Sequence, residues 1–247
     1  WQTRSTARVL PSTEITPTVT AAPESSLKSA PYNPDVLPAK YAQPEDVRSV
    51  YYQNISGTIV GGTSFPGSID QATTSLPISD SMIEGWEAIA QAGGVISSPS
   101  DQTLGPVKIE CDLEIKGSPN ITLEGHVWVA GNISIENSAD IRIAPSVGGA
   151  SIAMIADNPS DRLTSSKVEI ENSAQFFGSG SSGSYVLIVS QNNGAENGVD
   201  EEAVEVENNA NGDLLIYAGH GGILLKNSIS LKEVTGYKIT ITNNAEV

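Results

Sequence analysis

The heptapeptide ISIENSA at residues 133–139 returns with small changes as VEIENSA at 168–174 and as VEVENNA at 204–210. Related segments, LLKNS at 224–228 and ITITNNA at 239–245, follow further along the chain. Each copy is a short run of alternating apolar residues followed by a small turn built on Asn. One strand-and-turn unit that recurs at short intervals is the signature of a parallel β-solenoid.

The Asn residue of each copy sets the period. These residues are Asn137, Asn172, Asn208, Asn227 and Asn243, and they are separated by 35, 36, 19 and 16 positions. Because the first two intervals are about twice the last two, we expect coils of 16 to 19 residues, with every second turn of the earlier part degenerate or displaced by an insertion. Asn tolerates left-handed backbone angles, so these five residues are predicted to form the corners of the coils. Stacked at equivalent corners, their side chains would be able to form hydrogen-bonded ladders.

Residues 95–247 as a whole follow the same alternating pattern, with aromatic residues at only 5% of the chain. This predicts an all-β fold, a single-stranded parallel β-helix with short coils around a thin core of stacked aliphatic side chains. We expect a right-handed helix, because strict hexapeptide repeats of the left-handed type are missing. The continuous apolar run 185–189 indicates a strand covered on both faces, for instance by the N-terminal arm. The breaks at 157–166 and 190–203 are predicted to be loops that bulge from one face.

The N-terminal part divides into three segments. Residues 1–50 are rich in Pro, Ser and Thr and are expected to form an extended arm, either a disordered stalk or a segment docked on its own solenoid or on a neighbouring copy. Residues 51–78 contain the end of a strand around 50–52, a second apolar run to residue 62, and then a predicted loop from 63 to 76.

Residues 79–94 are predicted to form the one helix. Ser79 is a suitable N-cap, Met82, Ile83, Trp86, Ile89 and Ala90 share one face, and Gly93-Gly94 ends the pattern. The first coil of a solenoid exposes apolar core and needs a cap. We therefore expect this helix to cap the open end, with Trp86 as the plug; an aromatic platform for a ligand is the alternative.

The charge of the chain restricts its partners. There are 13 Lys and Arg against 29 Asp and Glu, a net charge of −16, which argues against nucleic acid and against an anionic membrane surface. No run approaches the ~20 apolar residues of a membrane-spanning helix. The single cysteine, Cys111, excludes an internal disulfide and is predicted to be a small core residue.

Metal sites and other cofactor sites have little support in the sequence. His126 and His220 are expected to be exposed turn residues, and no paired His or Cys spacing is present. Two acidic segments are candidates for Ca²⁺, Asp200-Glu201-Glu202 with Glu205 and Glu207, and Asp157-Asn158 with Asp161. Neither matches a defined calcium loop, and solvated charge is the preferred interpretation. The Ser-rich stretch 178–184 is predicted to be a loop.

A polysaccharide-cleaving solenoid is the alternative class, because such enzymes use paired carboxylates on the outer face of neighbouring coils. The candidates are Asp112, Glu114, Glu136, Asp140, Glu169, Glu171, Glu205 and Glu207. Most of them alternate with apolar residues or precede an Asn turn, so we expect solvated strand and corner residues. Few aromatic residues are available to stack on a sugar.

Several ordered motifs carry a family resemblance: IEGWEA at 83–88 with AGG at 92–94, LEGHVWVAGNI at 123–133, IAD at 155–157, FGSG at 177–180 with GSY at 183–185, LIYA at 215–218 and KEVTGYK at 232–238. Together they resemble an uncharacterised β-solenoid domain of PilX-type pilus-associated bacterial surface proteins. A weaker similarity is to bactofilins, which polymerise end to end. The resemblance implies a surface or pilus-linked location and a non-catalytic role, and it assigns no site residues. The prepilin-like helix of those proteins has no counterpart in the Pro-rich residues 1–50.

The expected function is therefore that of a non-enzymatic extracellular protein, a pilus-linked or filament-forming subunit or adhesin. Self-association head to tail, with the arm docked on a neighbour, is the expected partnership. A surface glycan is a second expected partner, and the alternative function is binding or cleavage of a polysaccharide.

Overall fold

The computed structural model describes residues 8–9, 49–52, 63–66, 76–97, 102–199, 201–243, 245 and 247, which belong to two units, 1–75 and 76–247. In the first unit, β1 is Arg8–Val9, and β2 (Ser49–Tyr52) pairs in parallel with β3 (Thr63–Pro66). The strand predicted around residues 50–52 is thus confirmed. Residues 63–66 were expected to be loop and are instead a strand, because they pair with β2. The rest of the predicted arm and lead-in lies outside the described residues.

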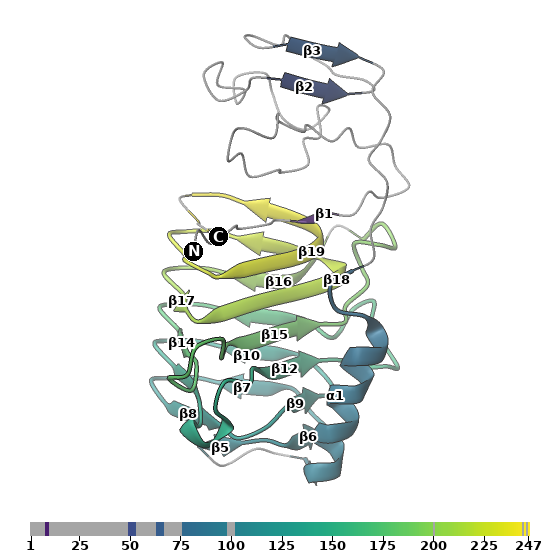
Figure 1. Cartoon of the computed structure of the whole chain (residues 1–247). Coiled ribbons are helices and arrows are strands. Elements are labelled where there is room, and N and C mark those ends of the chain that lie inside the picture. Colours follow the sequence, from purple (N-terminus) through teal and green to yellow (C-terminus); the bar gives the residue numbers. More distant parts are fainter. Residues whose placement is uncertain are drawn as a thin grey trace. The chain divides into compact units, whose positions relative to one another are not determined.

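The second unit is a parallel β-solenoid with three faces (Figure 1). Face 1 consists of β4 (Val95–Ile96), β6 (Val107–Ile109), β9 (Val127–Val129), β12 (Ile152–Ala156), β15 (Val186–Ser190) and the first part of β18 (Leu214–Leu225). Face 2 consists of β7 (Leu113–Ile115), β10 (Ile133–Ile135), β13 (Val168–Ile170), β16 (Glu202–Val206) and the second part of β18. Face 3 consists of β5 (Thr103–Leu104), β8 (Asn120–Leu123), β11 (Asp140–Ile143), β14 (Gln175–Phe177) and β17 (Asn211–Gly212). The last strand, β19 (Glu233–Ile241), pairs with both parts of β18, and all these pairings are parallel. The predicted all-β parallel solenoid is confirmed.

The strand register on face 2 gives the length of each coil. Successive partners are separated by 20, 35, 36, 19 and 16 positions, and they are Leu113, Ile133, Val168, Val204, Ile223 and Ile239. The short coils agree with the expected length. The intervals of 35 and 36 were expected to contain two coils each and contain one, because Ile133 pairs directly with Val168 and Val168 with Val204.

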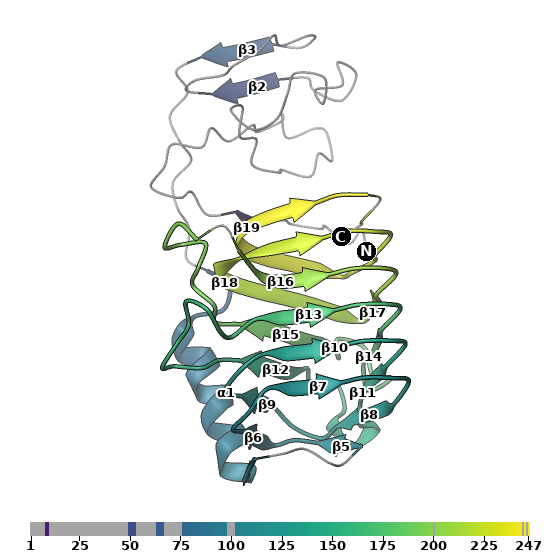
Figure 2. The ribbon, with the colours of Figure 1, turned by 180° about the vertical axis from the view of Figure 1, so that it is seen from behind.

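Insertions at two corners lengthen those two coils. The loop predicted at 157–166 is confirmed. The loop predicted at 190–203 is confirmed except at residue 190, which belongs to β15, and at residues 202–203, which belong to β16, while residue 200 lies outside the described residues. Both loops leave the corner between faces 1 and 2, where they bulge from the stacked strands (Figure 2). The connections from face 3 to face 1 are also longer in these coils and include η2 (Pro145–Val147) and the predicted Ser-rich loop. Because the extra residues leave at corners, the strands before and after them keep their register.

The Asn residues occupy the corner between faces 2 and 3, as predicted. Their φ angles are positive: 60° for Asn137, 55° for Asn172 and Asn208, 65° for Asn227 and 52° for Asn243. The predicted ladder is also present. Asn208 Nδ2 donates to Asn172 Oδ1 at 3.3 Å, Asn227 to Asn208 at 2.8 Å, and Asn243 to Asn227 at 3.1 Å. A left-handed backbone costs an ordinary residue about 1–2 kcal/mol, and Asn tolerates it better. Asn is therefore repeated at these corners because it accepts the backbone angle and because its side-chain amide forms the ladder.

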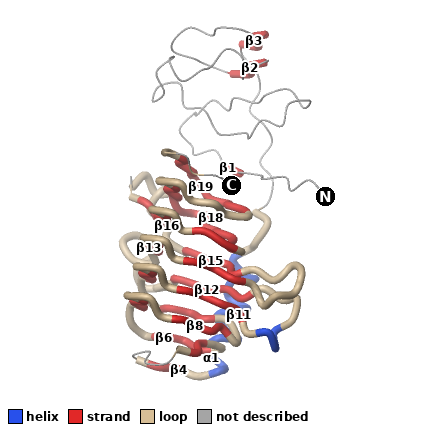
Figure 3. Tube along the Cα trace, turned by 90° about the vertical axis from the view of Figure 1, so that its left-hand side faces the viewer, coloured by secondary structure: helices blue, strands red, loops and turns tan. Residues whose placement is uncertain are grey.

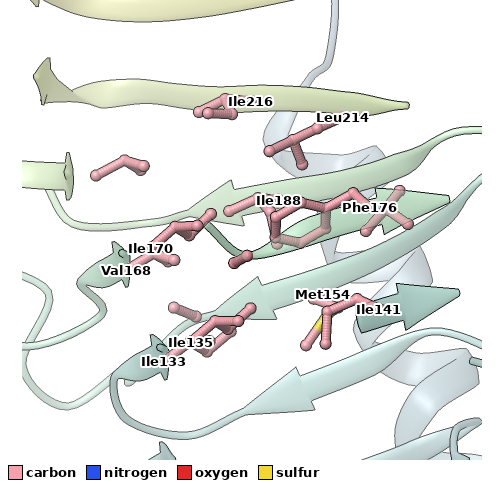
Figure 4. Close-up of a cluster of buried hydrophobic side chains, with 14 of the residues drawn as sticks. Ile133, Ile135, Ile141, Met154, Val168, Ile170, Phe176, Ile188, Leu214 and Ile216 are labelled. Atoms are coloured by element: carbon pink, nitrogen blue, oxygen red, sulfur yellow. The ribbon is translucent and has the colours of Figure 1, made fainter. Parts of the chain in front are cut away.

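The core is a stack of aliphatic side chains that follows the strand register (Figure 4). Ile135 and Ile170 face each other from adjacent strands and are both fully buried. Full burial of one such side chain stabilises the fold by roughly 1.5–3 kcal/mol. Cys111 packs against this core, half-buried, and its thiol donates to the Ser97 carbonyl at 3.1 Å.

Helix α1 (Asp80–Gly93) is confirmed, with Ser79 Oγ accepting from the Met82 amide at 3.3 Å and Gly94 following its last turn. Its expected position over the first coil requires correction. The helix runs along the side of the solenoid over face 1 (Figures 1 and 3), and half-buried Trp86 packs there rather than as a plug. The physical reason is that β12 and β15 are apolar on both faces, so their outer side needs cover. The two-sided burial predicted for 185–189 is confirmed for 186–189, while Tyr185 lies before the strand and is half-buried. Helix α1 is part of the cover.

Candidate functional site

Six of the carboxylates singled out in the sequence lie on the outer surface of face 2, which we name the acidic face. Glu114, Glu169 and Glu205 are in one register column, and Glu136, Glu171 and Glu207 each follow β10, β13 and β16 by one position. The alternation of strand residues explains this, since every second side chain points outward. Asp112 lies before β7, where its Oδ1 accepts from the Asn132 amide at 2.7 Å, and Asp140 opens β11 on face 3.

Lysines from the same face neutralise part of this charge. Lys226 Nζ lies 2.7 Å from Glu205 Oε1 and also binds Glu207. Lys116 Nζ lies 3.4 Å from Glu114 and 3.7 Å from Glu136. The hydrogen bond between Glu205 and Glu207 lowers the pKa of Glu205 and raises that of Glu207, and the two carboxylates raise the pKa of Lys226. The three side chains form one network across adjacent strands.

The spacing of Glu205 and Glu207 differs from that of a glycosidase carboxyl pair. Glycosidase carboxyl groups stand about 5–9.5 Å apart to admit a sugar or a water, whereas Glu205 and Glu207 are hydrogen-bonded to each other. Two outward-facing aromatic rings lie on the other faces, and each is covered by a cation. Lys108 Nζ is 4.2 Å from the Trp128 ring centre, and Arg142 Cζ is 4.1 Å from that of Phe177.

The calcium candidates have protein partners. Glu201 pairs with Lys167, Glu202 opens β16, and Asp200 lies outside the described residues. In the second cluster, Asp161 accepts from the Thr164 amide at 3.0 Å. Across the described ranges, no group of three or more His, Cys, Asp or Glu residues is arranged to hold a metal ion.

A second group of ionisable side chains lies in the helix seam, which we define as the contact of α1 with face 1 and its loops. Glu87 of α1 is 7% exposed and Asp157, directly after β12, is fully buried. Arg162 Nε and Nη2 donate to the two carboxylate oxygens of Asp157, both at 2.7 Å, and Trp128 Nε1 donates to the Asp157 carbonyl at 2.9 Å. The loop 157–166 is thereby tied to the strand end beneath the helix.

The protonation state of Glu87 differs from that of an ordinary glutamate side chain. Burial, followed by the charge and the hydrogen bond of Asp157, raises the pKa of Glu87 to about 8. The side chain is therefore a neutral carboxylic acid at pH 7. Its Oε1 is buried without a hydrogen-bond partner.

Both histidines belong to the same seam. The prediction that they are exposed turn residues is wrong. His126 is half-buried beside Trp86, with ring centres 5.7 Å apart, and its Nδ1 accepts from the Ala153 amide at 3.0 Å. Burial lowers the pKa of His126. His220 lies within β18, where Nδ1 is 2.7 Å from Glu196 and Nε2 is 3.2 Å from Asp80. The seam thus connects α1 to strands and loops far away in the sequence.

Sequence reasoning did not identify Glu87, Arg162 or the histidine contacts. One signal was available for Glu87, which is four positions after Ile83 and three before Ala90, both fully buried. A carboxyl group on that side of the helix has to enter the contact. The positions of Asp157 and Arg162 opposite it follow from the coil register, which only the pairing of distant strands establishes.

Comparisons with family models, with curated proteins and with solved structures found no match. None of the helices in the described ranges has the length and apolar character needed to span a membrane.

Proposed function

We propose that this chain is a non-enzymatic structural protein of the cell surface, a β-solenoid subunit of a pilus-linked or other filamentous assembly. The observation that carries the proposal is the repetition of one stacking geometry from coil to coil. Parallel strands pair in register on every face, and the Asn ladder joins the corners of four successive coils.

This stacking favours assembly because the ends of a solenoid present the same strand edges that its coils use internally. Contact between unlike ends is head-to-tail and does not close, so it yields a filament. The ion pairs of the acidic face favour a structural surface over a reactive one, since Lys226 pairs with both Glu205 and Glu207. A net charge of −16 would limit side-to-side aggregation of such rods.

The proposal includes two features that concern a partner. Residues 1–50, rich in Pro, would dock as an arm on a neighbouring copy, and a surface glycan would be the target of an adhesin at the tip. Proteolysis of the assembled particle tests the arm. We expect residues 1–50 to be protected in the particle, and immediate cleavage there would exclude the docked arm.

Electron microscopy and light scattering of the full chain test the assembly. We expect filaments at high protein concentration, and we expect Ile241→Asp to abolish them. Ile241 is in the last coil and is 41% exposed. Leu163→Asp is the matched control, because Leu163 is 43% exposed on the loop 157–166, away from the end. A chain that stays monomeric at every concentration would exclude the filament role. Turnover of a polysaccharide that is lost in Glu205→Gln would exclude the non-enzymatic role.

A further inference from the structure

The outer side of face 1 is an apolar strip that α1 covers. The register places Ala153 beside Leu187 and Ile155 beside Val189, and these side chains with Tyr217 form one cluster with Ile83 of the helix. All are less than 9% exposed, so detachment of the helix would return the strip to water. The attachment of α1 is therefore a separate contact, and it does not depend on the proposed function.

Glu87 is 7% exposed in the middle of this attachment, and its Oε1 is buried without a hydrogen-bond partner. Burial, followed by the charge and the hydrogen bond of the fully buried Asp157, raises the pKa of Glu87. Asp157 accepts hydrogen bonds from Nε and Nη2 of Arg162, whereas the pKa of Glu87 is raised, so the proton is on Glu87. The remaining charged neighbour of Glu87 is Glu84, from the same helix. The two buried carboxyl groups, Glu87 and Asp157, thus have a single guanidinium between them, and one proton on Glu87 balances the charges.

We propose that the proton on the buried carboxyl group of Glu87 holds α1 on the solenoid, so that the helix is a strap whose attachment weakens when this proton leaves. In the detached helix, Glu87 is in water and is an ordinary carboxylic acid. Detachment is therefore coupled to the loss of one proton.

The sign of the pH dependence follows from this coupling. The pKa of Glu87 is about 8 when the helix is attached, against an ordinary value of 4.5. Between these limits the attached state binds the extra proton, so a rise in pH favours detachment, by at most roughly tenfold for each pH unit. Above pH 8 the dependence levels off, because Glu87 is ionised in both states.

Two other titratable groups contact the helix and need controls. His126 lies against Trp86 and is buried as the neutral base. Protonation of His126, below its ordinary pKa of 6.5, therefore opposes attachment of the helix. His220 contacts Asp80 at the first residue of the helix. A comparison between pH 6.5 and pH 8 keeps His126 largely neutral in the attached state, where burial lowers its pKa, and His220→Gln tests the second contact.

Hydrogen exchange of the full chain at these two pH values, corrected for intrinsic exchange rates, measures the opening of α1. We expect its opening equilibrium to rise roughly tenfold from pH 6.5 to pH 8 in the wild type, in Glu84→Gln and in His220→Gln, with no such rise in Glu87→Gln. Amides of β13 and β16 serve as the internal reference. No rise in the wild type, or the same rise in Glu87→Gln, would overturn the proposal. Should Glu87→Gln fail to fold, carboxyl-carbon NMR of the wild type decides: a Glu87 midpoint near 8 supports the strap, and one near 4.5 overturns it.

Discussion

Asn227 donates from Nδ2 to Oδ1 of Asn208, one coil earlier, at a distance of 2.8 Å. The two residues are 19 positions apart and have φ angles of 65° and 55°. Asn208 in turn donates to Asn172, so it is bonded on both sides of its corner. The same residue type therefore sets the turn of its own coil and the contact between coils.

The Asn208 corner gives the first prediction. Asn208→Ala removes two ladder hydrogen bonds and places Ala, which tolerates a left-handed angle less well than Asn, at this corner. We therefore expect a loss of about 2–4 kcal/mol in the free energy of unfolding. Asn208→Gly relieves the backbone cost and is expected to lose less. Urea unfolding measures both. Asn243→Ala, with one ladder bond, is the matched control. Equal losses at positions 208 and 243 would contradict a role for the ladder.

The in-register column of Ile135 and Ile241 gives the second prediction. Ile135 is fully buried in the middle of the stack, whereas Ile241 in the last coil is 41% exposed. We expect Ile135→Ala to cost about 2–5 kcal/mol because it leaves a cavity, and Ile241→Ala to cost much less. Denaturant melts of the two variants provide the comparison. A larger loss at position 241 would mean that the centre of the stack is not the most tightly packed part.

The Lys226 network gives the third prediction. Lys226→Gln leaves Glu205 and Glu207 without their shared cation, and we expect a loss of about 1 kcal/mol at pH 7. The hydrogen bond from Glu207 and the contact with Lys226 lower the pKa of Glu205. The contribution is therefore present above the ordinary pKa of 4.5 and is lost as the pH falls through the lowered value. Stability measured against pH should show the wild type and the variant converging in acid. Lys232→Gln, whose partner Asp213 is 3.9 Å away, should have little effect at any pH.

His126 gives the fourth prediction. Its burial lowers its pKa, so the folded state prefers the neutral imidazole that accepts from the Ala153 amide. The stability associated with this preference is present above pH 6.5 and decreases as the pH falls from 6.5 to the lowered pKa. NMR titration of the imidazole should give a midpoint below 6.5, and His126→Gln should remove this part of the pH dependence. A midpoint above 6.5 would show that the ring is not buried as described.

The amino-acid sequence determined the features that depend on neighbours along the chain. Alternation in segments such as 133–135 predicts a strand with one buried side, and the Asn that follows predicts a left-handed corner. The helix from Asp80 to Gly93 was predictable in the same way, from its cap, its apolar spacing and its final Gly residues. These signals are local, because backbone angles and the alternation of side chains are set within a few residues.

Only the tertiary structure decided which distant residues meet. The 35 positions from Ile133 to Val168 fit one coil with insertions as well as two short coils, and the parallel pairing selects one. The apolar outer side of β12 and β15 draws α1 to the side of the solenoid, away from its end. Glu87 and Asp157 are 70 positions apart, and neither has a sequence neighbour that predicts two buried carboxyl groups in one contact. Burial and the proximity of a second charge raise the pKa of a carboxyl group. Both arise only when the coils are stacked and the helix is in place.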